Sequence, residues 1–117
     1  MENRIEKFSD KENYIMSIAI IELGGPYHVS SRFYDHLYRF HQKELDLINE
    51  DLEKGEGIFI SSIPLVLDAL YLMLETNDVD FNVICRNDIH GSRVGIITRD
   101  DVKILYNNLE TAYKEES

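Results

Sequence analysis

The stretch VGIITRDDVKIL (residues 94–105) contains two polar residues, Thr98 and Asp101, near the end of the chain. Their hydroxyl and carboxylate groups are three residues apart, a spacing that could serve either a helix start or a ligand. A threonine three residues before an acidic residue has the spacing of a helix N-cap and the third residue of that helix. The hydroxyl then accepts a hydrogen bond from the third amide, and the carboxylate accepts one from the amide of the cap. Free amides at the same helix start also suit a phosphate. The pair therefore predicts either a helix cap alone or a ligand site.

The surroundings of this pair resemble a single CBS domain over residues 58–106. Members of that family have a strand, an Ala-Leu-x-x-Met-type helix, two further strands and a Gly-h-x-Thr-x-x-Asp signature that opens the last helix. Here the helix reads DALYLM (residues 68–73) and the signature reads GIITRDD (residues 95–101).

The resemblance implies an adenosyl nucleotide as ligand, with its phosphate and ribose contacted by Thr98 and Asp101. Arg99, within the signature, and Arg93, shortly before it, are the cations expected at the same ligand site. Because CBS domains act in pairs, the resemblance also implies a homodimer that completes the site. Apart from this nucleotide, no cofactor is expected.

Acidic residues form the second candidate, a surface rather than a motif. The net charge is −10, from 22 acidic and 12 basic residues, which argues against direct binding to nucleic acid or to an anionic membrane. It suits a basic protein partner, and small immunity proteins and phage-encoded inhibitors are often acidic and free of catalytic motifs. A solvated helix face is the alternative. The residues predicted to bind such a partner are Glu44, Asp46, Glu50, Asp51 and Glu53.

Catalytic and metal-binding patterns are weak in this sequence. His41 and Glu44 are three residues apart, which can place two metal ligands on neighbouring helical turns, but no cluster supplies the remaining ligands. Asp35 and His36 are adjacent, and adjacent helical residues point about 100° apart, so the carboxylate could not orient the imidazole. We therefore predict no metal site and no catalytic residues, and a binding protein is expected more than an enzyme.

The elements that must position these residues are mostly helices. A strand through the isoleucine-rich residues 15–21 is the alternative to the first helix, for which Asp10 is the expected N-cap. Gly55 is expected to end the second helix, and Ser62 to cap the third, which is apolar nearly all round. The expected helices lie in residues 9–26, 30–57, 62–75 and 99–115, with strands in residues 57–61, 80–86 and 92–98, the last two as an antiparallel hairpin.

Together these elements predict an α+β fold, a helix-rich single domain over residues 1–117 with a small antiparallel sheet in the C-terminal half. Residues 1–57 form the helical half and residues 58–117 a β-α-β-β-α half. A single cysteine excludes an intramolecular disulfide. With neither a signal-peptide pattern nor an apolar run long enough to span a bilayer, we expect a cytoplasmic protein.

Overall fold

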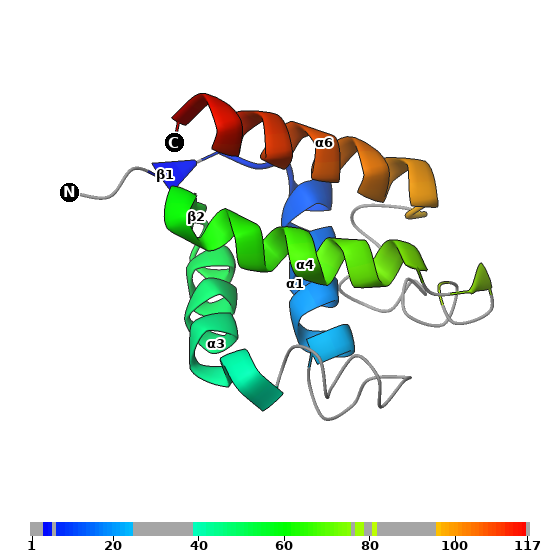
Figure 1. Cartoon of the computed structure of the whole chain (residues 1–117), viewed down its shortest axis with the longest axis horizontal. Coiled ribbons are helices and arrows are strands. Elements are labelled where there is room, and N and C mark those ends of the chain that lie inside the picture. The colour runs from blue at the N-terminus through cyan, green and yellow to red at the C-terminus, as the bar shows by residue number, and fades with distance from the viewer. Residues whose placement is uncertain are drawn as a thin grey trace.

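A computed structural model describes residues 4–5, 7–24, 39–75, 77–78, 81 and 96–116 of the chain. Within them, α1 and α4 pack against each other at the centre, α6 packs on α4, and α3 packs on α1 (Figure 1). The elements are β1 (Arg4–Ile5), α1 (Asp10–Gly24), α3 (Arg39–Glu53), β2 (Ile58–Phe59), the 3-10 turn η2 (Ile60–Ser62), α4 (Ile63–Glu75) and α6 (Arg99–Glu116).

Helix α1 begins with a capping box that starts one residue earlier than expected. The hydroxyl of Ser9 accepts a hydrogen bond from the Glu12 amide (3.1 Å), and the Glu12 carboxylate accepts one from the Ser9 amide (2.8 Å). The N-cap is thus Ser9, and the prediction of Asp10 is wrong. The helix itself is confirmed over the strand alternative. Its isoleucine-rich middle is buried on more than one side because both α3 and α4 pack against it.

Helix α3 is amphipathic, as expected, and ends as expected. Leu45, Ile48 and Leu52 are buried along one stripe. At its end the Gly55 amide bonds to the Leu52 carbonyl (3.1 Å) and the Glu56 amide to the Asp51 carbonyl (3.0 Å), with Gly55 at φ 73°. This is a Schellman motif, which a glycine forms without steric strain. The expected start of this helix near residue 30 lies outside the described residues.

Helix α4 is the buried centre of the fold, which confirms the expectation from its apolar sequence. Five of its side chains have no exposed surface because α1 lies on one side of the helix and α6 on another (Figure 1). The predicted cap, Ser62, is wrong. It lies inside η2, and the Ile63 amide bonds to the Ile60 carbonyl so that the 3-10 turn runs directly into α4. The five side chains are Ile63, Val66, Ala69, Leu70 and Met73.

A small antiparallel sheet completes the helix-rich α+β fold and confirms the predicted class. Its location is only half as predicted: β2 lies within the expected strand at residues 57–61, but its partner is β1 at the other end of the chain, with Arg4 opposite Phe59. Most of the predicted hairpin lies outside the described residues. Of its described members, Phe81 is helical and residues 96–98 are not in a strand.

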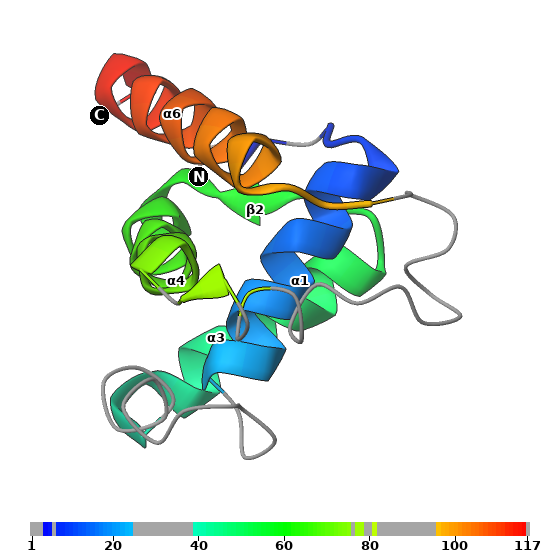
Figure 2. The same cartoon turned by 90° about the vertical axis from the view of Figure 1, so that its right-hand side faces the viewer.

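The first turns of α1 and α6 lie side by side. Figure 2 shows the start of α6 next to the upper end of α1, and the Lys11 ammonium lies 3.0 Å from the Asp101 carboxylate.

Among the helices of the described residues, none has both the length and the apolarity needed to cross a membrane.

Candidate functional site

The Thr98–Asp101 pair forms the start of α6, as the cap interpretation predicts. The Thr98 amide donates to Asp101 Oδ2 (2.9 Å), and the Asp101 amide donates to Thr98 Oγ1 (3.2 Å). The carboxylate also pairs with Lys11 Nζ from α1 (3.0 Å). The hydroxyl and the carboxylate that the CBS resemblance assigns to a nucleotide are therefore both held by groups of this chain.

The contacts of Asp101 keep its carboxylate ionised. The hydrogen bond from the Thr98 amide lowers the pKa of Asp101, partial burial opposes that effect, and bonds from Lys11 and the Thr98 hydroxyl add to the lowering. An ionised carboxylate at a helix N-terminus is favourable because it faces the positive end of the helix dipole. The same negative charge repels a phosphate placed at this helix start.

Arg99 connects α6 to the end of α4. Its Nη1 donates to the Leu74 carbonyl (2.7 Å) and its Nε lies 3.3 Å from Asp78 Oδ1. The guanidinium also lies over the ring of Phe81, 4.6 Å from the centroid. These contacts give Arg99 a structural role. Arg93 lies outside the described residues, so the predicted nucleotide site as a whole stays a prediction.

The five acidic residues predicted to bind a partner do not share one face of α3. Since successive helical residues are turned by about 100°, Glu44 and Asp51 lie on one flank and the other three point outward. The outward residues are partly engaged: Glu50 pairs with Lys54 (3.5 Å), and Glu53 accepts a hydrogen bond from Asn49 (3.2 Å). The helix therefore presents two acidic surfaces, an outer face (Asp46, Glu50 and Glu53) and a flank (Glu44 and Asp51).

The flank borders a groove of about 470 Å³ between α3 and the junction of η2 with α4. Glu44 and Asp51 supply its carboxylates, and Ser61 and Ser62 supply hydroxyl groups. Leu47 stands between the two acids and is 63% exposed, so an apolar side chain in contact with water borders the groove. The apolar lining residues are Leu47, Ile48, Phe59 and Leu65.

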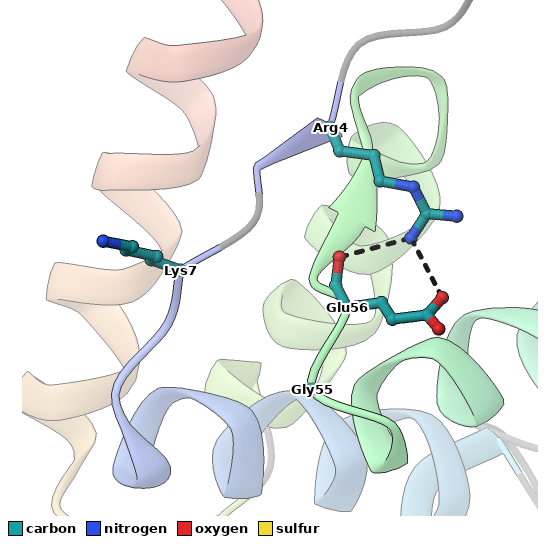
Figure 3. A pocket seen from close by; sticks show the side chains of 4 residues that line it. All are labelled: Arg4, Lys7, Gly55 and Glu56. Atoms are coloured by element: carbon teal, nitrogen blue, oxygen red, sulfur yellow. Dashed lines mark hydrogen bonds and ion pairs between the residues drawn. The ribbon is translucent and has the colours of Figure 1, made fainter.

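An arginine of this chain already uses two of the groove residues. Arg4 Nη1 lies 3.7 Å from Asp51 Oδ2, and the guanidinium carbon lies 3.8 Å from the centroid of the Phe59 ring. The same nitrogen donates to the Glu56 carbonyl (3.2 Å) and lies 3.7 Å from the Glu56 carboxylate (Figure 3). Asp51, Glu56 and Phe59 therefore bind a guanidinium by charge, hydrogen bonding and stacking.

A second hollow, of about 570 Å³, lies beside Arg4, Lys7, Gly55 and Glu56. In Figure 3, Lys7 points away from the Arg4–Glu56 pair, so the two cations do not converge. Because the charge of Arg4 is offset by two carboxylates, the exposed Lys7 is the one described lining residue that offers an anion an unopposed positive charge. The described residues that line this hollow therefore form no arrangement for binding an anion or for catalysis.

The histidine considered for a metal site lies at a kink. His41 has non-helical dihedral angles (φ −130°, ψ 23°), and its side chain is 41% exposed. Its Nδ1 lies 3.7 Å from Glu44 Oε2. Across the described part of the chain, no group of three or more histidine, cysteine or acidic residues is placed to hold a metal ion.

Comparison of the chain with protein-family models, with curated proteins and with solved structures finds no match. The groove was missed from the sequence because it depends on how η2 and α4 approach α3. The split of the acidic residues into two surfaces could have been found, since helical periodicity alone separates Glu44 and Asp51 from the outer face.

Proposed function

We propose that this chain is a non-catalytic binding protein of the cytoplasm that engages a basic protein partner through α3, as a stoichiometric inhibitor of the immunity type. The observation that carries the proposal is the combination on α3 of open carboxylates with an exposed apolar residue beside a groove. Glu44 is 67% exposed, Glu50 57% and Leu47 63%. A monomer is sufficient for this function.

Charged and apolar side chains contribute differently to such an interface. Exposed carboxylates steer a basic partner toward the helix and raise the rate of association, and salt weakens this effect. Affinity depends more on a few side chains that become buried at the centre of the contact. Leu47 and the apolar lining of the groove can provide that centre, which an acidic face without apolar residues could not do.

The test is a selection from a displayed library of random peptides in 0.15 M salt, about the physiological ionic strength. The bait is the wild-type chain or one of two triple charge reversals. The first changes Glu44, Glu50 and Asp51 to lysine on α3. The control changes Asp68, Glu115 and Glu116, exposed acids of α4 and α6, and alters the net charge by the same amount.

We expect the wild type and the control to enrich basic peptides, and the α3 variant to lose them. Calorimetry on the best peptide should give one peptide per chain. Enrichment of neutral or acidic peptides, or equal loss in both variants, would overturn the proposal. Adenine nucleotides in native mass spectrometry provide the contrast: a bound nucleotide that is lost in Thr98→Ala would favour the site implied by the CBS resemblance instead.

A further inference from the structure

The guanidinium of Arg4, a residue of this chain, shows which chemical group the residues of the groove beside α3 can bind. Arg4 reaches it from β1, pairs with Asp51 (3.7 Å) and stacks on Phe59 (3.8 Å). Yet Arg4 meets only one end of the acidic flank. Glu44 lies at the other end, and among the described residues its ion-pair partner is His41 (3.7 Å), which is charged only when protonated. Within the described part of the chain, Arg4 therefore offsets only part of the negative charge of the groove.

The spacing of the two acids limits the shape of a partner. Glu44 and Asp51 are seven residues apart on α3, which corresponds to about 10.5 Å along the helix axis. Leu47 lies between them on the same flank, beside the apolar lining of Ile48 and Leu65. A helical partner segment presents cations at the same distance when they too are seven residues apart, with an apolar residue between them.

We propose that the groove between α3 and the η2–α4 junction binds a helical segment of the partner with two arginines seven positions apart and an apolar residue between them. One guanidinium pairs with Glu44 and the other with Asp51, and the apolar side chain packs against Leu47 and Leu65. This inference rests on the proposed function and assigns it to the flank of α3 rather than to the outer face.

Arginine suits this groove better than lysine. A guanidinium is planar, donates several hydrogen bonds in a fixed fork and stacks on an aromatic ring, whereas an ammonium is a compact and strongly hydrated charge. The serine hydroxyls of η2 lie next to the carboxylates as accepting groups, and a partner guanidinium that displaces Arg4 can stack on Phe59. The contact of Arg4 with Phe59 demonstrates the stacking within this chain.

The probe is a capped alanine-based peptide of about 15 residues, near the shortest length at which such helices persist in water. It has two arginines seven positions apart and one leucine between them. A second peptide has lysines in place of the arginines, and a third has the same composition with the arginines on opposite sides of the helix. Fluorescence anisotropy gives the dissociation constants, and amide chemical shifts locate the contact.

Two pairs of neutral variants separate the flank from the outer face. Glu44→Gln/Asp51→Asn removes the two charges of the flank, and Asp46→Asn/Glu50→Gln removes the same number from the outer face. We expect the flank pair to weaken binding of the arginine peptide at least tenfold, and the outer pair by less than about threefold. The lysine and rearranged peptides should bind several-fold more weakly than the arginine peptide.

Leu47→Asn gives a second test without a risk to folding, because the side chain is exposed. We expect Leu47→Asn to weaken binding of the arginine peptide several-fold. In the wild type, the changes in amide chemical shift should be centred on the residues of the groove. Equal losses in the two acid pairs, or shift changes centred on Asp46 and Glu53, would overturn this inference but leave the proposed function in place. No binding of the arginine peptide would also overturn it, and the library selection would then decide the proposed function alone.

Discussion

The start of α6 and the flank of α3 are both acidic and both were candidate sites, but they differ in what already satisfies their polar atoms. At the start of α6, the Thr98 hydroxyl and the Asp101 carboxylate are used by two backbone amides and Lys11. On the flank, Glu44 is largely exposed and an open Leu47 stands beside it. The first region uses its charge to hold helices together, and the second keeps its charge available.

The start of α6 is a short sequence motif, whereas the flank of α3 is a surface formed by residues of no recognisable motif. A short motif such as Thr-x-x-Asp satisfies its own backbone and needs no ligand to explain it. The flank of α3 differs because an exposed Leu47 lies beside the apolar lining of the groove, and apolar area rimmed by polar residues is typical of contact sites when it is contiguous. The proposed binding site therefore lies in the region without a recognisable sequence pattern.

The largest expected effect tests whether the start of α6 is structural. Arg99→Ala removes the bond to the Leu74 carbonyl and the contact with Phe81, and should lower the free energy of unfolding by about 2 kcal/mol. Urea unfolding measures the loss. Affinity for the arginine peptide should stay unchanged. A stable Arg99→Ala variant with weakened binding would instead assign Arg99 to a binding site and remove the contrast between the two regions.

Loss of the cap itself should have a smaller effect. Thr98→Ala leaves the Asp101 amide without its acceptor and should lower the free energy of unfolding by about 1 kcal/mol. Thr98→Ser keeps a hydroxyl and is the matched control, with most of the stability retained. Thermal unfolding followed by circular dichroism compares the three proteins. Equal stability of the wild type and Thr98→Ala would show that the cap contributes nothing, and a role other than capping would then be needed to explain Thr98.

On the flank, Arg4 should compete with the partner for Asp51. Arg4→Gln removes an ion pair worth up to about 1 kcal/mol, so affinity for the arginine peptide should rise by a factor of about two to five. Lys7→Gln, which removes a nearby positive charge that Figure 3 shows pointing elsewhere, is the control. Anisotropy with both variants measures the change. A loss of affinity in Arg4→Gln would show that Arg4 supports the groove rather than competes for it.

Sequence reasoning succeeded where the contacts are local. The Thr98–Asp101 cap, the end of α3 at Gly55 and the buried character of α4 depend on neighbours within one or two turns. The Ser9–Glu12 box has the same signal and could have been found from its spacing, but Asp10 was preferred.

The features that escaped prediction involve residues far apart in the chain. Strand β1 has two residues, too few to show an alternating pattern, and Arg4 contacts a residue 52 positions away. The groove forms only when η2 turns β2 into α4 beside α3. The exposure of Leu47, by contrast, follows from helical periodicity, because Leu47 lies off the buried stripe of Leu45, Ile48 and Leu52.

The smallest expected effect concerns how the contribution of Asp101, at the start of α6, to the free energy of unfolding depends on pH. The Thr98 amide lowers the pKa of Asp101 below its ordinary value of 3.8, so the folded state binds this proton less readily than the unfolded state does. The stabilisation is therefore complete above the unfolded pKa and is lost as the pH falls through the folded one. Urea unfolding from about pH 6 to about pH 3 should show that the cost of Asp101→Asn shrinks on acidification.

Asp100→Asn, an exposed residue of the same first turn, controls for the loss of a negative charge at this helix end. If Asp101 owes its stabilising effect to the capping bond, then at neutral pH Asp101→Asn should cost more than Asp100→Asn. Equal costs would mean that only the charge near the helix dipole matters. The start of α6 would then lack the specific contacts that distinguish it from the flank of α3. The difference between the two regions in how their polar atoms are satisfied would no longer hold.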